Sequence, residues 1–80
     1  MKPDHIYQKL DLGLDLAKMD FEDGLITREE LSKKAQKYFG EANEQLRLMP
    51  LEDAKKYHKT KEWIDILEYQ TIQYLNWAKN

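Results

Sequence analysis

Apolar residues recur along most of the chain at spacings of three and four positions, the pattern of an α-helix that buries one face. In the first segment this series consists of Ile6, Leu10, Leu14, Ala17 and Phe21. A second apolar series follows the same segment on a different face and consists of Leu12, Leu16 and Met19. The pattern predicts a helix over residues 4–19 with two apolar faces.

Residues 10–16 also alternate between leucine and other residues, which is the pattern of a β-strand. Gly13 lies within this stretch and costs a helix about 1 kcal/mol relative to alanine. We nevertheless predict a helix, because the helical period continues beyond the alternating stretch on both sides. Asp4 is the expected N-cap, since its carboxylate can accept hydrogen bonds from unpaired backbone N–H groups.

The clearest local signal is the turn that follows. Gly24 supplies the turn, and Thr27 and Glu30 have the spacing of a capping box. In this motif the threonine hydroxyl accepts a hydrogen bond from the Glu30 N–H, and the Glu30 carboxylate accepts one from the Thr27 N–H. Gly24, Thr27 and Glu30 are therefore assigned structural roles at the start of a second helix.

The second helix is predicted over residues 28–48. Its apolar stripe, with Phe39 beside it, consists of Leu31, Ala35, Tyr38, Ala42, Leu46 and Met49. Gly40 is a candidate helix end, but the stripe keeps its phase through this glycine. Pro50 disfavours helical backbone in the residue before it and ends the helix.

A third helix is predicted over residues 51–78. Thr60 is predicted to cap a new helical start within this range. From Trp63 onward, its main apolar face consists of Ile64, Leu67, Thr71, Tyr74, Leu75 and Ala78. Ile66 and Trp77 widen this face, whereas Tyr69 and Ile72 fall outside it. We predict an all-α fold, a three-helix bundle or an elongated helical hairpin, in a single domain over residues 1–80.

Composition and charge narrow the class of protein. The 80 residues include 13 basic and 15 acidic side chains, a net charge of −2, and no cysteine. The net charge is −4 over residues 1–31, +4 over residues 32–61 and −2 over residues 62–80. This polarity argues against both a DNA mimic and a dedicated DNA-binding protein. The lack of cysteine, of an apolar run of membrane-spanning length and of an N-terminal signal predicts a cytoplasmic protein.

The turn resembles an EF-hand loop in part, at Asp23, Gly24, Ile26 and Glu30. The first and third positions of that loop would be Met19 and Phe21, which cannot ligate a hard cation. We therefore predict no calcium site.

Residues 16–35 resemble the SHOCT family of short helical hairpins. The matching residues are Leu16, Asp23, Gly24, Leu25, Ile26, Thr27, Glu29, Glu30, Leu31 and Lys34. The resemblance covers about a third of the chain, with the motif nearer the N-terminus than in the family and two further helical segments after it. It implies an interaction or oligomerisation module.

The basic run is the candidate nucleic-acid surface, formed by Lys55, Lys56, Tyr57, Lys59 and Lys61. Lysines that neutralise phosphates release counterions, and a tyrosine among them can stack on a base. The opposing interpretation is a solvated helix face, which is what charge runs usually form. Sequence-specific recognition is not expected, because the region contains a single arginine, Arg47.

No catalytic set is present. His58 with Glu62, and Asp11 with Asp15, have helical spacing, but neither pair has a third convergent ligand or the pocket that acid–base chemistry needs. The chain has no glycine-rich phosphate loop and no nucleophile–base set. We predict no enzymatic activity, metal, cofactor or small-molecule substrate.

The remaining feature is excess apolar and aromatic surface, which usually marks an interface. Trp63 and Tyr74 are predicted to be core. The predicted protein interface consists of Leu12, Leu16, Tyr69, Ile72 and Trp77. The leading hypothesis is a small helical adaptor or regulator, of bacterial or phage origin, that binds a protein partner or itself. The alternatives are a nucleic-acid accessory protein and an immunity or inhibitor protein against a toxin or nuclease.

Overall fold

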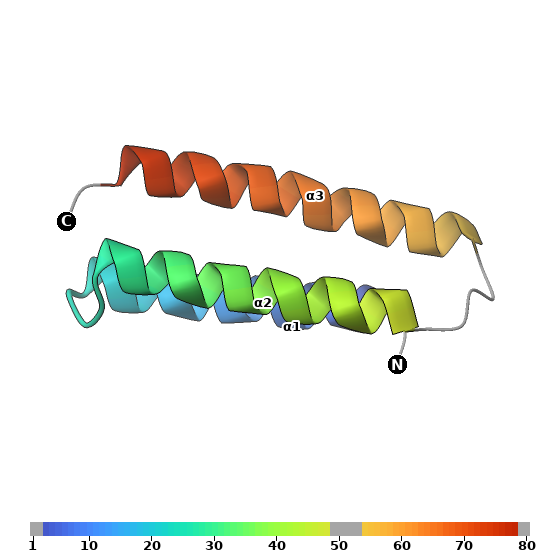
Figure 1. Ribbon diagram of the computed structural model, residues 1–80, viewed down its shortest axis with the longest axis horizontal. Coiled ribbons are helices and arrows are strands. Elements are labelled where there is room, and N and C mark those ends of the chain that lie inside the picture. The colour runs from blue at the N-terminus through green and yellow to red at the C-terminus, as the bar shows by residue number, and fades with distance from the viewer. Residues whose placement is uncertain (1–2, 49–53, 79–80) are drawn as a thin grey trace.

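The protein is an up-down-up bundle of three helices. The computed structural model describes residues 3–48 and 54–78, and contains α1 (Pro3–Glu22), α2 (Arg28–Leu48) and α3 (Ala54–Trp77), with no strand among those residues. Figure 1 shows α1 and α2 as an antiparallel pair, with α3 running along both. The bundle extends 43 × 19 × 14 Å, and α3 ends at the same end of the bundle as the α1–α2 turn. The all-α prediction is confirmed.

The helix boundaries follow the sequence pattern closely, with two differences at α1. Pro3 rather than Asp4 opens the helix, so the prediction that Asp4 is the N-cap is wrong. Proline suits the first helical position because it needs no backbone hydrogen bond there. The helix also continues past Met19 to Glu22, where Phe21 and Glu22 contact Tyr74 of α3. The predicted start of the third helix at residue 51 lies outside the described residues.

One face of each helix forms the core, as the apolar spacing predicts. The buried apolar side chains are Ile6, Leu10, Leu14, Ala17, Leu31, Ala35, Phe39, Ala42, Leu46, Ile64, Leu67 and Ala78. Residues 10–16 are helical, so the strand alternative is wrong. Trp63 and Tyr74 are half-buried; Trp63 contacts the ring of Tyr7 with centroids 5.7 Å apart.

Thr60 does not cap a fresh helical start. It lies within the continuous helix α3 and is buried against the core, so that prediction is wrong. Thr60 is in phase with Ile64, Leu67 and Thr71 on the inward face, and with no glycine or proline after Pro50 nothing interrupts the helix there.

The α1–α2 turn is fixed by hydrogen bonds on both sides. The Leu25 N–H donates to the Asp20 carbonyl (2.8 Å) and the Gly24 N–H to the Phe21 carbonyl (3.0 Å), which is a Schellman motif. Gly24 has φ = 78°, a conformation that disfavours side chains with a Cβ. Both bonds of the predicted capping box are present at 3.1 Å between Thr27 and Glu30. The turn therefore sets the antiparallel pairing of α1 and α2.

Candidate protein-binding surfaces

All five predicted interface residues are exposed, but the structure does not bring them together. Leu12 and Leu16 line a groove between α1 and α2, and Ile72 lines a second groove between α2 and α3. Trp77 lines a pocket at the end of the bundle where α1 ends, while Tyr69 lines none of these hollows. The predicted interface is thus divided among separate surfaces.

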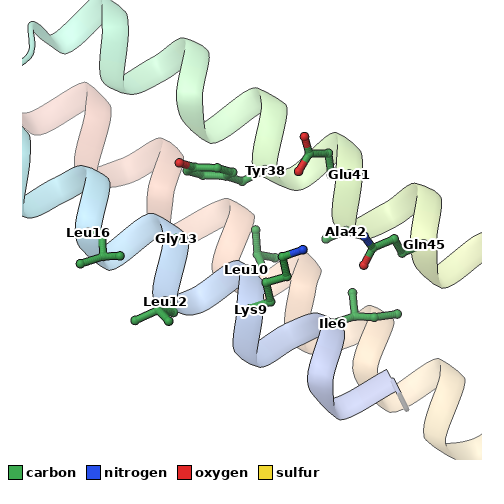
Figure 2. Close-up of a pocket in the computed structure, with 10 residues that line it drawn as sticks. All are labelled: Ile6, Lys9, Leu10, Leu12, Gly13, Leu16, Tyr38, Glu41, Ala42 and Gln45. Carbon is green, nitrogen blue, oxygen red and sulfur yellow. The ribbon is translucent and has the colours of Figure 1, made fainter. Parts of the chain in front are cut away.

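The α1–α2 groove has a volume of about 230 Å³. Its lining residues are Ile6, Lys9, Leu10, Leu12, Gly13, Leu16, Tyr38, Glu41, Ala42 and Gln45. Figure 2 shows Tyr38 reaching from α2 toward Gly13, and Leu12 and Leu16 at the outer edge of the groove, on the side of α1 away from α2. The lining is mostly apolar, with Lys9, Glu41 and Gln45 as its polar members.

Gly13 lies in this groove beside the Tyr38 ring. A methyl group at Gly13 would lie 3.5 Å from Cε2 of Tyr38, which is ordinary van der Waals contact. The packing of Tyr38 therefore tolerates a Cβ at this position. Because Gly13 has no side chain, the α1 backbone is bare beside the Tyr38 ring.

The groove continues into an apolar stripe on the outside of α1, formed by Leu12, Leu16 and Met19 and called here the outer stripe. These side chains are 61%, 53% and 55% exposed. Their spacing of four and three aligns them along one helix face. The core face of α1 is occupied by α2 and α3, and none of the three side chains of the outer stripe belongs to the core cluster.

Helix α1, which contains the outer stripe, is negatively charged overall. Helix α1 contains five acidic and two basic residues, a net charge of −3 with histidine neutral. One of the two basic side chains, Lys18, lies with its Nζ 5.1 Å from the centre of the Tyr74 ring on α3. The ammonium group of Lys18 is thus held toward α3, whereas the other basic residue, Lys9, lines the same groove as Leu12 and Leu16.

The second groove, between α2 and α3, has a volume of about 450 Å³. Its lining is more polar than that of the α1–α2 groove and consists of Ser32, Ala35, Gln36, Phe39, Gly40, Asn43, Glu68, Thr71, Ile72 and Leu75. Ile72 is its one exposed large apolar side chain. It therefore offers a partner less apolar surface than the outer stripe does.

The third hollow, called here the end pocket, is lined by Phe21, Glu22, Tyr74, Trp77 and Ala78 and has a volume of about 490 Å³. The rings of Phe21 and Tyr74 meet edge to face with centroids 6.4 Å apart. The Tyr74 hydroxyl donates a hydrogen bond of 3.0 Å to Oε1 of Glu22. Sequence reasoning did not find this pocket, because its members come from opposite ends of the chain.

Burial raises the pKa of the Tyr74 phenol, and the hydrogen bond to Glu22 and its negative charge raise it further. Replacing Glu22 by glutamine removes the charge, so we expect the pKa of Tyr74 to fall toward its ordinary value of about 10. NMR of ring-labelled tyrosine, titrated between pH 8 and 12, measures it residue by residue. Glu29→Gln, an exposed carboxylate elsewhere, is the control; an equal fall in both variants would contradict the assignment.

The same shift implies a pH dependence of stability. The unfolded phenol ionises at a lower pH than the folded one, so unfolding releases protons above pH 10 and stability falls as pH rises through that range.

The basic run is spread over more than one face of α3: Lys55 and Lys59 are one turn apart, whereas Lys56 and Lys61 lie on other faces. The Lys59 ammonium lies 5.4 Å from the centre of the Trp63 ring. The Lys61 ammonium donates to Asn43 Oδ1 (3.0 Å) and Asp65 Oδ1 (2.9 Å). The Tyr57 ring is half-buried and packs against the core, so it is not placed to stack on a base. Lys55 and Lys56 are exposed, and as helix neighbours they point in different directions.

The described residues form no metal site. Over residues 3–48 and 54–78, no three His, Cys, Asp or Glu side chains come close enough to hold a metal ion. The Glu30 carboxylate, which occupies the last position of the EF-hand-like loop, accepts its hydrogen bond from the Thr27 backbone. None of the described helices is long and apolar enough to cross a membrane.

Comparison with known proteins gives no relative: the chain matches no family model, no curated protein and no solved structure.

Proposed function

We propose that this protein is a non-catalytic interaction module that binds a protein partner through the outer stripe of α1 and the adjoining α1–α2 groove. The observation that carries the proposal is the exposure of Leu12, Leu16 and Met19 on a helix whose opposite face already fills the core. Contiguous exposed apolar surface of this kind is typical of interaction sites. The resemblance to the SHOCT hairpin, and a cytoplasmic location suggested by the lack of cysteine, fit this role.

The shape of the surface favours a helical partner. The outer stripe and the α1–α2 groove both run along α1, and Leu12 and Leu16 lie beside the part of the groove that contains Gly13. An amphipathic helix can place apolar side chains at positions i, i+3 or i+4 and i+7 against such a surface. The polar groups of Lys9, Glu41 and Gln45 then lie at the edge, where they can fix the direction of the partner helix.

The charge of α1 favours a basic partner over a second copy of this chain. Two copies packed through the outer stripe would bring together two helices of net charge −3, and like charges across an interface are unfavourable. A partner helix with lysine or arginine beside its apolar positions is attracted instead. A basic toxin or nuclease has this character, so the inhibitor hypothesis is one form of the same proposal.

We expect the double variant Leu12→Gln, Leu16→Gln to lose partner binding by roughly 10- to 100-fold, since each buried leucine contributes at least about 1 kcal/mol. Folding stability should change by less than about 1 kcal/mol, because both side chains are exposed in the free protein. Affinity is measured by isothermal titration against the partner, and stability by urea unfolding.

The matched control is Leu48→Gln, Ile66→Gln, which removes two apolar side chains of similar exposure from α2 and α3. The proposal requires this control to bind as the wild type does. Equal losses in both double variants would show that general surface apolarity, and not the outer stripe, supports binding.

A further inference from the structure

The end pocket has the composition of a site for an organic cation. Phe21, Tyr74 and Trp77 supply three aromatic rings, and Glu22 supplies a carboxylate. Aromatic faces attract ammonium and guanidinium groups, and tryptophan does so most strongly. Trp77 is 80% exposed, so its indole is available to a ligand.

A contact between a cation and an aromatic ring already exists beside the end pocket. The Lys18 ammonium lies 5.1 Å from the centre of the Tyr74 ring, and the Tyr74 hydroxyl is turned to Glu22. The Tyr74 ring therefore already contacts one cation, and the Glu22 carboxylate lies at the hydroxyl end of the same side chain. The pocket extends from this pair to Trp77 and, at about 490 Å³, has room for a further side chain.

The electrostatics at the end of α1 also favour a cation. The last turn of α1 contains Asp20 and Glu22 but no basic residue, and Asp23 follows it. The C-terminal carbonyl groups of a helix carry partial negative charge, so these carboxylates increase an existing negative potential. Near the C-terminal end of α3, a cation already binds a backbone carbonyl: Nε of Arg28 donates a 2.6 Å hydrogen bond to the Leu75 carbonyl.

We propose that the end pocket binds the side chain of an arginine from a protein partner. The planar guanidinium stacks on the exposed Trp77 indole, while its N–H groups donate to the carboxylate of Glu22. A carboxylate accepts several hydrogen bonds, so the bond from Tyr74 does not prevent this. The pocket does not involve the outer stripe, and the proposal stands independently of the binding role assigned to that stripe.

The experiment titrates the full chain with N-acetyl-arginine methylamide and, as the neutral counterpart of the same shape, N-acetyl-citrulline methylamide. The indole N–H signal of Trp77 is followed by NMR and assigned with Trp77→Phe. We expect saturable, millimolar binding of the arginine derivative, the affinity of an exposed cation–π contact with one carboxylate. The citrulline derivative should bind at least about fivefold more weakly, because it lacks the charge.

Substitutions then locate the site. Glu22→Gln and Trp77→Leu should each weaken arginine binding by about threefold or more, whereas Lys18→Gln should strengthen it, since a neighbouring positive charge is removed. Glu29→Gln and Tyr69→Leu remove an exposed carboxylate and an exposed ring elsewhere and should leave it unchanged. Circular dichroism verifies that each variant folds.

Two results would overturn the proposal. Equal binding of the arginine and citrulline derivatives would show that charge is not recognised, and unchanged binding in Glu22→Gln and Trp77→Leu would show that the cation binds elsewhere. The variant Leu12→Gln, Leu16→Gln should retain arginine binding. A failure of the outer stripe as an interface is therefore distinguishable from a failure of this pocket.

Discussion

Replacing Ile64 by alanine is expected to lower the free energy of unfolding by about 2–5 kcal/mol, the cost of removing a buried branched side chain and leaving a cavity. Ile64 is 0% exposed and belongs to the cluster where the three helices meet. An 80-residue domain has roughly 4–12 kcal/mol of total stability, so this single change can remove much of it. Urea unfolding followed by circular dichroism at 222 nm measures the loss.

Ile66 provides the control in the same helix. The same substitution, Ile66→Ala, removes the same atoms from a side chain that is 52% exposed, and is expected to cost less than about 1 kcal/mol. Equal costs at the two positions would mean that α3 is rotated about its axis relative to the structure described here. The comparison thus tests the orientation of α3 as well as the strength of its packing.

Replacing Thr60 by valine is expected to raise the free energy of unfolding by about 1–2 kcal/mol. The Thr60 hydroxyl is buried and, among the described residues, has no hydrogen-bond partner. A buried polar group without a partner costs about 1–3 kcal/mol, and valine replaces it with a methyl group on a side chain of the same branching. Thermal and urea unfolding both report the gain.

Thr71 gives the opposite expectation in the same helix. Its hydroxyl is also buried but donates a 2.8 Å hydrogen bond to the Leu67 carbonyl. Thr71→Val removes a bond that is made, so stability should fall by up to about 1 kcal/mol. If Thr60→Val destabilises the protein as Thr71→Val does, the Thr60 hydroxyl has a partner and the account of this position is wrong.

Much of the fold could be predicted from the sequence because its determinants are local. The 3.6-residue period assigns Leu14 and Leu46 to the core, and the capping box of Thr27 and Glu30 needs residues only three apart. The Schellman motif at Gly24 is also local, although the sequence analysis recognised only a turn. Interactions of this range depend little on how the helices pack.

The surfaces could not be predicted to the same degree, because each depends on which helices lie side by side. Leu12, Leu16 and Trp77 are all exposed, but Leu12 and Leu16 line a groove between α1 and α2, whereas Trp77 lines a pocket where the ends of α1 and α3 meet. Lys61 and Tyr57 are assigned to the same candidate surface because both belong to the basic run. In the structure, Lys61 binds Asn43 of α2, whereas Tyr57 packs on the core.

The outer stripe is tested most directly by photo-crosslinking. The photoreactive residue p-benzoylphenylalanine is placed at position 16 or, as the control on another face with nearly equal exposure, at position 66, and the source cells are irradiated. We predict a discrete crosslinked protein from position 16 that is absent from position 66. The same product from both positions, or a product from position 66 alone, would contradict binding through the outer stripe of α1.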